Sequence, residues 1–391
     1  MRIGLVLPEA PQYSETFFNH KIRGLTDSGF EVIVFSNKKE KKKFGYKIRS
    51  AYPVYEKKPV KQTVMLFWVL GLTFIKAPKN FIRLFKLERK GNGSFSKSLK
   101  SIYINSHIIT EKIDCLHFGF ATMTLKRENV AKAVNAKMSV SFRGFDINIY
   151  PLKNPGCYDL LWQKADKVHS ISDYLYKKAL KLGLPENVFY RKITPAIDVN
   201  QFRVKDNKGI IGNKIRILTI GRLNWIKDYE TAISAMKILK DKGIDFIYNI
   251  VGAGTELERL TFAVYQCGLQ DRVFFSGKKE HKEINSMMIE SDIYIQTSMQ
   301  EGFCVSVLEA QASGLLCIVS DADGLKENIQ DGVTGWIVKR RDPSSFASKI
   351  EYVINLSEEK RRVVSGNARR RVEESFTIEK QNLLFKEFFN S

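Results

Sequence analysis

One stretch of this sequence, residues 291–338, reads as a strand, a loop, a helix, a second strand and a second loop. Residues 292–297 are short, β-branched and aromatic, which is typical of a buried strand. A helix is expected to begin near Cys304 and to end at Gly314, because glycine suits the position just after a helix. Residues 315–320 have the composition of the next buried strand. The stretch therefore predicts a βαβ unit of an α/β protein.

Two glutamates in this unit, Glu301 and Glu309, are eight positions apart, one on the loop and one on the helix. The start of a helix leaves backbone N–H groups without partners, and such groups bind phosphate. The expected donors are the N–H groups of Gly302, Phe303, Cys304, Val305 and Ser306. A carboxylate on each side of a phosphate site is reasonable only if each one binds a neutral, hydroxylated group. A nucleotide-sugar has this order of groups: sugar, diphosphate, ribose.

The string E-G-F-x-x-x-x-x-E-A, from Glu301 to Ala310, resembles the E-x7-E signature of retaining glycosyltransferases of family 4, which have the GT-B fold. The alternative is a pair of solvent-exposed glutamates beside a helix. The resemblance implies two doubly wound, Rossmann-like α/β domains that face a deep interdomain cleft. It also implies sugar transfer with retention of configuration and without a metal. In that family Glu301 would hold the sugar and Glu309 the ribose.

Basic residues outnumber acidic ones, and the 391-residue chain has a formal net charge of +21. Such a charge indicates an anionic partner: nucleic acid, an anionic membrane surface or a phosphorylated substrate. A nucleic-acid-binding protein would need a helix-turn-helix or an aromatic and basic readout motif, and the sequence has neither. The five cysteines are irregularly spaced and form no CxxC motif, which favours a reducing compartment and no zinc site.

The sequence opens with a short apolar run that has the pattern of a strand rather than a signal peptide. The longest apolar run, residues 64–75, has 12 residues, whereas a membrane-spanning helix needs ~20. We therefore expect a cytoplasmic or peripheral protein.

Residues 3–7 and 31–36 have the pattern of buried strands on either side of a helix over residues 17–27. The loop before this helix resembles the P-x-x-SETF opening of bacterial family 4 enzymes, which implies that Ser14 and Glu15 lie on the acceptor side. The alternative is that these two residues cap the helix. A G-x-G-x-x-G motif is missing from the sequence here, so nothing indicates a dinucleotide.

A lysine-rich segment precedes an apolar and basic one. Residues 38–61 contain nine lysines, with Lys41, Lys42 and Lys43 in one run. An apolar run over residues 64–75 then leads into an aromatic and basic helix that reaches residue 90, and the aromatic residues of this segment include Trp68, Phe74, Phe81 and Phe85. Basic and bulky apolar residues at helical spacing are typical of a segment that lies on a membrane surface. The alternative is a set of helices that pack on the sheet and expose a solvated basic face.

Two further strands are expected at residues 115–118 and 137–142. They resemble family 4 strands whose loops line the acceptor side, which implies roles there for His117, Arg143 and Asp146. Relatives often have histidine where this chain has Arg143. An arginine can bind a phosphate or a sugar hydroxyl, but its pKa is too high for a general base. For His117 the alternative is a purely structural histidine.

Residues 215–220 are expected to form the first strand of a second array, and Arg222 and Lys227 follow it. The pair resembles the family's grip on the donor diphosphate, where two cations neutralise the leaving group. The alternative is two exposed basic residues. The next strand, residues 245–251, is followed by Gly252 and Gly254, which would allow a tight turn beneath a nucleotide.

Asp321 and Asp323 form a D-A-D triplet, which binds a metal in the other major glycosyltransferase fold. We reject a metal site here, because the triplet aligns with a glycine-rich loop of family 4 and metal sites need more than two exposed carboxylates. The expected reaction thus uses no metal and no cofactor, with a UDP- or GDP-linked sugar as substrate.

The resemblance covers nearly the whole chain and implies an acceptor-binding domain (residues 1–204), a nucleotide-sugar-binding domain (205–370) and a C-terminal helix (371–391) that returns to the first domain. The expected function is transfer of a hexose to a lipid-linked or oligosaccharide acceptor in cell-surface polysaccharide biosynthesis, at the inner face of a bacterial membrane. Nucleic acid is not an expected partner. A sugar-nucleotide epimerase of the same fold remains an alternative.

Overall fold

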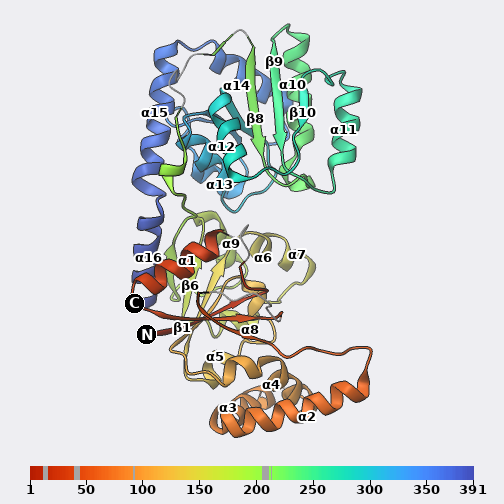
Figure 1. The fold of residues 1–391 in the computed structure, drawn as a ribbon, viewed down its shortest axis with the longest axis vertical. Helices are drawn as coiled ribbons and strands as arrows, with labels where there is room; N and C mark the ends of the chain where they lie inside the picture. The colour runs from red at the N-terminus through yellow and green to blue at the C-terminus, as the bar shows by residue number, and fades with distance from the viewer. Residues whose placement is uncertain (12–15, 39–44, 91–92, 205–210, 213) are drawn as a thin grey trace. The chain divides into compact units, whose positions relative to one another are not determined.

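The structure, a computed structural model, describes residues 1–11, 16–38, 45–90, 93–204, 211–212 and 214–391. The chain forms two compact units (Figure 1). The first contains Met1–Ile193 and Asn382–Ser391, and the second contains Thr194–Gln381.

The first unit is built on a parallel sheet of seven strands in the order β3-β2-β1-β4-β5-β6-β7. Its strands are β1 (Arg2–Leu7), β2 (Glu31–Ser36), β3 (Lys47–Ser50), β4 (Cys115–Phe118), β5 (Lys137–Phe142), β6 (Lys167–Ser170) and β7 (Phe189–Lys192). Its helices are α1 (Thr16–Asp27), α2 (Pro59–Lys76), α3 (Pro78–Lys90), α4 (Phe95–Ile109), η1 (Ala121–Thr124), α5 (Val130–Ala133), α6 (Phe145–Asn148), α7 (Tyr150–Lys153), α8 (Asp159–Trp162) and α9 (Asp173–Lys181).

The second unit is built on a parallel sheet of six strands in the order β10-β9-β8-β11-β12-β13. Its strands are β8 (Ile215–Ile220), β9 (Phe246–Val251), β10 (Val273–Phe275), β11 (Ile293–Gln296), β12 (Leu316–Ser320) and β13 (Trp336–Val338). Its helices are η2 (Val199–Gln201), η3 (Trp225–Lys227), α10 (Tyr229–Asp241), α11 (Leu257–Gln266), α12 (His281–Glu290), α13 (Val305–Ala312), η4 (Asp323–Asn328), α14 (Pro343–Ile354) and α15 (Glu358–Ser375). The last helix, α16 (Ile378–Asn390), begins in the second unit and ends in the first.

Both sheets have the strand order of a doubly wound fold, in which the chain direction across the sheet reverses between two central strands. In the second unit this point lies between β8 and β11, which are neighbours in the sheet although β9 and β10 separate them in sequence. Ligands of doubly wound folds bind beyond the carboxyl ends of the strands at this point. The segments that follow β8 and β11 are therefore the place to examine for a site.

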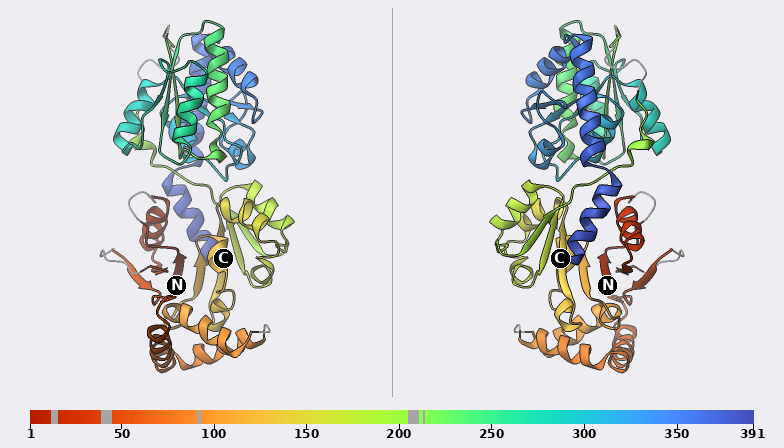
Figure 2. Two further views of the ribbon diagram at one scale, coloured as in Figure 1. Left: turned by 90° about the vertical axis from the view of Figure 1, so that its right-hand side faces the viewer. Right: turned by 90° about the vertical axis from the view of Figure 1, so that its left-hand side faces the viewer.

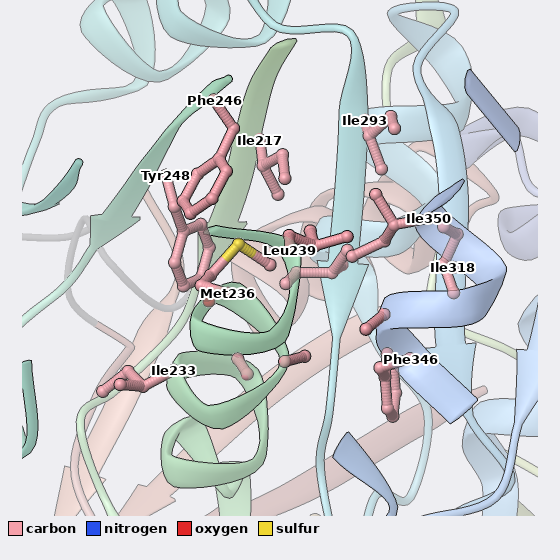
Figure 3. Packing of buried hydrophobic residues seen from close by; sticks show 14 of the residues in the cluster. Ile217, Ile233, Met236, Leu239, Phe246, Tyr248, Ile293, Ile318, Phe346 and Ile350 are labelled. Atoms are coloured by element: carbon pink, nitrogen blue, oxygen red, sulfur yellow. The ribbon is translucent and has the colours of Figure 1, made fainter. Parts of the chain in front are cut away.

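Buried aliphatic and aromatic side chains hold the helices of the second unit against its sheet (Figure 3). Ile217, Phe246 and Tyr248 project from the sheet toward Met236 and Leu239 of α10. Phe346 and Ile350 of α14 complete this cluster, and α10 and α14 also pack against each other. The strands can therefore be almost wholly apolar, as expected of a parallel sheet covered on both faces.

Most predicted elements are present at the predicted positions, and β2, β4, β5 and β8 have the predicted bounds. The edge strand β3 was not predicted, because Lys47 and Arg49 made its sequence look like part of the lysine-rich loop. Edge strands carry such charged residues without cost, since one side of the strand faces water. The division between the units falls at residues 193/194 and 381/382, rather than at 204/205 and 370/371.

The helices α2, α3 and α4 form a layer of their own at one end of the first unit, as all three views show (Figures 1 and 2). The chain bends by 119° between α2 and α3. In the described part of the chain no single helix is long and apolar enough to cross a membrane, although the bent α2–α3 pair meets the length and composition test jointly.

The end of α16 covers a buried polar cluster in the first unit. Lys21 of α1 is almost inaccessible to solvent, and its Nζ lies 2.8 Å from Nε2 of His117 and 4.1 Å from the ring centroid of Phe385. The His117 ring also contacts the Ser139 and Ser141 hydroxyls at 2.8 and 2.9 Å. Burial lowers the pKa of Lys21 well below its ordinary value, and the charge of Arg143 lowers it further.

Because folding lowers the pKa of Lys21, its amine binds a proton more readily in the unfolded chain than in the folded chain. Stability should therefore fall as the pH falls from the ordinary lysine pKa. Lys21→Met should raise the thermal midpoint at pH 7 by roughly 2–8 °C, because an apolar side chain replaces an amine that is costly to bury. The gain should shrink as the pH approaches 10. The measurement is thermal unfolding at pH 7 and 9.5.

Lys112→Met, at an exposed lysine, is the control. A lower midpoint for Lys21→Met than for this control at pH 7 would mean that the contact with His117 outweighs the cost of burying the amine.

Candidate functional site

The segments that follow β8 and β11 bring together two predicted residues that are far apart in sequence. Lys227 and Glu301 form an ion pair, and their side chains are only 15% and 13% exposed. Two contacts tie the segments to each other. The Met299 N–H donates to the Ile226 carbonyl at 2.8 Å, and the Thr297 hydroxyl donates to the Asp228 carbonyl at 2.8 Å. The ion pair is therefore fixed by the backbone on both sides.

Opposing effects set the protonation of Lys227. Burial alone lowers its pKa, but the negative charge of Glu301 and the hydrogen bond to its carboxylate raise it, and the net shift is upward. The positive charge of Arg222 is close enough to oppose this shift. Arg222 itself is exposed, and among the described residues nothing forms an ion pair or a side-chain hydrogen bond with its guanidinium. Lys227 is thus a firmly protonated cation, and Arg222 is a second cation free to bind an anion.

The first turn of α13 follows Glu301, as predicted. Its N-cap residue, Cys304, makes no side-chain cap. The Cys304 N–H donates instead to Oδ1 of Asn328 at 3.1 Å, so it is not a free phosphate donor. Phe303 is buried, with its ring centroid 5.6 Å from that of Phe376. The partly accessible members of the predicted set are Gly302, Val305 and Ser306, and these positions suit an anion at the helix start.

Glu309 lies in the second turn of α13 with part of its surface accessible. Burial raises the pKa of its carboxyl group to about 7. Among the described residues none forms a hydrogen bond or an ion pair with its side chain. A desolvated carboxyl group without a partner is a costly feature, and it fits a group that receives hydroxyl donors from a ligand.

Gly252 and Gly254 let two loops approach closely. A Cβ atom on Gly252 would lie 1.9 Å from the Gly221 carbonyl oxygen, and one on Gly254 would lie 2.1 Å from the Leu223 carbonyl oxygen. The Leu223 N–H donates to the Ala253 carbonyl at 3.0 Å across the same contact. The two glycines therefore allow close contact with the loop that carries Arg222, and the turn beneath a nucleotide stays a prediction.

The D-A-D carboxylates face an arginine. The guanidinium of Arg340 contacts Asp321 at 3.0 Å and Asp323 at 3.5 Å. Within the described ranges no group of three or more His, Cys, Asp or Glu residues is placed to hold a metal ion. A fixed cation between the two aspartates makes them unsuited to binding another.

The acceptor-side predictions have mixed outcomes. Ser14 and Glu15 lie outside the described residues. The prediction that His117 contacts a substrate is wrong for this structure, because the ring has no exposed surface and is used by Lys21 and two serines. Asp146 is also buried, and its carboxylate accepts from the N–H groups of Ala121, Arg143 and Gly144. Burial lowers the pKa of His117 far below its ordinary value, with smaller effects from Lys21 and His169.

Arg143 lies over aromatic rings of α1. Its guanidinium carbon is 3.8 Å from the ring centroid of Phe17 and 4.7 Å from that of Phe18. Such stacking stabilises a guanidinium. The Arg143 loop is thereby held in place by Asp146 and by α1.

The predicted membrane-facing residues are only partly the exposed ones. Trp68 and Phe74 are exposed, whereas Phe81 and Phe85 are partly buried. Lys41, Lys42 and Lys43 lie outside the described residues. The prediction missed apolar side chains that point outward from the same layer, namely Val60, Val64, Phe67, Ile75, Ile82 and Phe95. Their helical spacing alongside Lys76, Lys79 and Arg83 was the signal available in the sequence.

A cavity of about 400 Å³ lies beside the Lys227 loop, between the starts of α10 and α11. Its lining includes Asp228, Glu230 and Arg259, and Arg259 forms ion pairs with Glu230 and Glu256. Among the described residues that line it, none is Arg222, Lys227, Glu301 or Glu309. This cavity is therefore distinct from the site that the ion pair defines.

Known proteins resemble this chain over most of its length. Residues 200–371 match the family model described as "Glycosyl transferases group 1". The chain is 25% identical to the putative colanic acid biosynthesis glycosyltransferase WcaL of Escherichia coli K12, over 96% of both chains. It is 26% identical to the amylovoran biosynthesis glycosyltransferase AmsK of Erwinia amylovora, over 89% of both. A third relative is the UDP-Gal:alpha-D-GlcNAc-diphosphoundecaprenol alpha-1,3-galactosyltransferase of Escherichia coli, 27% identical over 80% of this chain and 79% of its own.

Solved structures share the fold. The structure of Anabaena HepE in complex with UDP and glucose superposes with a TM-score of 0.73 at 15% identity, over 100% of this chain and 99% of that one. Sucrose-phosphate synthase from Thermosynechococcus elongatus superposes with a TM-score of 0.74 at 16% identity, over 100% and 98%. The predicted GT-B fold, with two parallel α/β domains, is confirmed. The family match and the relatives together support a glycosyltransferase.

The raised pKa of Glu309 has a measurable consequence. The folded carboxyl group keeps its proton up to about pH 7, whereas its ordinary pKa is 4.5. Stability should therefore fall as the pH rises through this window. Glu309→Gln should raise the thermal midpoint at pH 8 by roughly 2–6 °C and change it much less at pH 5. Thermal unfolding across this pH range is the measurement.

Glu258→Gln, at an exposed glutamate of α11, is the matched control and should change the midpoint little at either pH. Equal effects of the two substitutions at pH 8 would contradict a desolvated Glu309.

Proposed function

We propose that this chain is a GT-B glycosyltransferase that transfers a hexose from a UDP- or GDP-linked sugar to a lipid-linked or oligosaccharide acceptor. The transfer would retain the anomeric configuration, would need no metal and would serve the synthesis of a cell-surface polysaccharide. One observation carries the proposal. Lys227, Glu301, Arg222 and the start of α13 converge beyond β8 and β11 with an unpartnered, desolvated Glu309 one turn further along the helix. The names of the bacterial relatives support the polysaccharide role.

Each part of a nucleotide-sugar has a chemical counterpart in this arrangement. The Lys227 ammonium and the Arg222 guanidinium would neutralise the diphosphate as it leaves, and the N–H groups of the first turn of α13 would bind its oxygens. The Glu301 carboxylate would accept hydrogen bonds from sugar hydroxyls and stabilise the positive charge that develops at the anomeric carbon. Glu309 would accept from the ribose hydroxyls.

The reaction then needs no metal. The bond between the anomeric carbon and the diphosphate oxygen breaks, the acceptor hydroxyl oxygen forms its new bond on the same face of the sugar, and the hydroxyl proton passes to the departing diphosphate oxygen. Two cations and a helix start already supply the charge that a divalent ion would otherwise supply. The acceptor is proposed to bind the first unit near the Arg143 loop, whose guanidinium can hold a phosphate or a hydroxyl group.

Glu301→Gln should lower turnover by about 10- to 150-fold, because a hydrogen bond to a charged group in the transition state contributes about 1.5–3 kcal/mol. Turnover would be measured as release of UDP or GDP from UDP-glucose, UDP-galactose, UDP-N-acetylglucosamine and GDP-mannose. N-acetylglucosaminyl diphosphoundecaprenol and membrane lipid extract would be the acceptors. The anomeric configuration of the product would be read by NMR.

The control is Glu258→Gln, which should keep full activity. Full turnover of the Glu301 variant at saturating donor would contradict the assignment. A sugar nucleotide that changes its configuration without transfer would identify an epimerase instead.

Excess EDTA should leave turnover within about two-fold of its value without chelator, because Lys227 and Arg222 would already neutralise the diphosphate. The measurement compares the chelated enzyme with and without added Mg²⁺ or Mn²⁺. Loss of activity in EDTA and its recovery with either ion would contradict metal-independent transfer.

We also propose that α2 and α3, in the layer of helices at one end of the first unit, dock on an anionic membrane surface at the inner face of the cell membrane. Phe67 and Ile75 are 68% and 78% exposed, and exposed basic residues flank them, namely Lys57, Lys58, Lys61, Lys76, Lys79, Arg83, Lys86, Arg89 and Lys90. Apolar side chains with a basic border are what an interfacial helix requires. Such docking would bring the first unit to a lipid-linked acceptor.

Phe67→Ser with Ile75→Ser should remove the salt-resistant part of binding to anionic vesicles, because apolar burial does not depend on salt. Lys79→Glu with Arg83→Glu and Lys86→Glu should weaken binding at low salt, at about 1 kcal/mol for each charge near the surface. Co-sedimentation with vesicles of neutral and of anionic lipid is the measurement.

The control is Phe262→Ser with Tyr265→Ser, which alters an exposed aromatic pair on α11 of the second unit. Equal and negligible binding of the unaltered chain to both kinds of vesicle would mean that the layer is only a solvated surface.

A further inference from the structure

The strand β11 carries polar side chains where a central strand normally has apolar ones. Tyr294 and Gln296 are both 0% exposed, and β11 lies between β8 and β12. Burying a hydroxyl group and an amide is unfavourable unless each finds hydrogen-bond partners. The contacts of these two side chains therefore explain why the strand tolerates them.

Their hydrogen bonds form one chain that ends at Glu301. The Tyr294 hydroxyl donates to Oε1 of Gln296 at 2.9 Å. The Gln296 amide donates to the Ser298 hydroxyl at 2.8 Å, and this hydroxyl donates to Oε1 of Glu301 at 3.0 Å. The Gln296 amide and the Ser298 hydroxyl both donate in the direction of the carboxylate that pairs with Lys227. Hydrogen bonds aligned in this manner polarise and strengthen one another.

A second branch connects the same hydroxyl to the rest of the site. The Tyr294 oxygen lies 2.8 Å from the Ser306 hydroxyl in the first turn of α13. It also lies 3.2 Å from the carbonyl of Ile220, two residues before Arg222, and Ser306 donates to this same carbonyl at 3.2 Å. The Tyr294 hydroxyl thus meets the end of β8, the start of α13 and the chain to Glu301.

We propose that Tyr294 and Gln296 are positioning residues that hold Glu301 and the first turn of α13 in the geometry needed for transfer. The proposal rests on the proposed function and adds a buried connection between the sugar-binding carboxylate and the diphosphate-binding turn. Neither residue touches the substrate, and both act through Ser298, Glu301 and Ser306.

A nearby pair shows what a merely structural contact looks like. Tyr248 of β9 is equally buried, and its hydroxyl lies 2.9 Å from the Thr219 hydroxyl. Thr219 donates to the Ile295 carbonyl at 2.7 Å. This branch ends in the backbone of the sheet without reaching Glu301, so Tyr248→Phe removes a buried hydroxyl without disturbing the chain to Glu301.

The experiment compares Tyr294→Phe and Gln296→Leu with Tyr248→Phe. Turnover is measured with the four sugar nucleotides named above, and UDP and GDP binding is measured by calorimetry. Tyr294→Phe and Gln296→Leu should each lower kcat by about 10- to 100-fold, as loss of a hydrogen bond that supports a charged group does. The KM for the donor in Gln296→Leu should stay within about three-fold, because Ser306 and Arg222 are untouched. Tyr248→Phe should keep full kcat.

Gln296→Glu provides a conservative rescue. A protonated carboxyl group copies the amide, because it accepts from Tyr294 and donates to Ser298, whereas a carboxylate cannot donate. Its kcat relative to that of the unaltered chain should therefore fall as the pH rises. Gln296→Leu should be equally impaired at every pH.

The outcomes separate the two proposals. The positioning role would be overturned if the unaltered chain is active and kcat is equal in Tyr294→Phe, Gln296→Leu and Tyr248→Phe. The proposed function would then remain intact. Thermal unfolding identifies a variant that has lost its fold. In that case the pH dependence of Gln296→Glu decides the question, and a relative kcat that does not change with pH would contradict the proposal. An unaltered chain that neither binds UDP or GDP nor transfers sugar would overturn the proposed function, and the positioning role with it.

Discussion

The ion pair between Lys227 and Glu301 is the interaction on which the candidate site depends. Its partners are 74 positions apart in sequence, and the doubly wound order brings them together by making β8 and β11 neighbours. Both side chains are largely buried, so each would be costly to bury without the other. A nucleotide-sugar would give Lys227 a second anion to bind, and its hydroxyl groups would donate to Glu301. Binding of the donor would therefore offset part of the free energy that burying the ion pair costs.

The surrounding loops keep this pair in place. Gly252 and Gly254 allow the Arg222 loop to lie against its neighbour, and Thr297 ties the Lys227 loop to the segment after β11. Arg340 holds the two aspartates of the following loop. Preorganisation of this kind is costly when the protein folds and reduces the rearrangement needed during the reaction.

Local pattern predicted most strands, the start of α13 and the pair of glutamates, because these depend on residue type and spacing. The features that the sequence did not reveal depend on contacts between residues far apart in the chain. His117 looked like an exposed ligand, but its partner Lys21 lies 96 positions earlier in the chain. The pairing of Glu301 with Lys227 could not be read from either segment alone, because the two residues are 74 positions apart. Tyr294 and Gln296 broke the apolar pattern of their strand, which was a visible signal of a buried polar network.

A crystal structure of the complex with a UDP-linked sugar tests the central claim most directly. The account predicts that the diphosphate oxygens accept hydrogen bonds from the N–H groups at the start of α13 and from Lys227 and Arg222. It further predicts that Glu301 contacts the sugar and Glu309 the ribose. A nucleotide bound instead in the cavity lined by Asp228, Glu230 and Arg259, with Glu301 and Glu309 untouched, would contradict it.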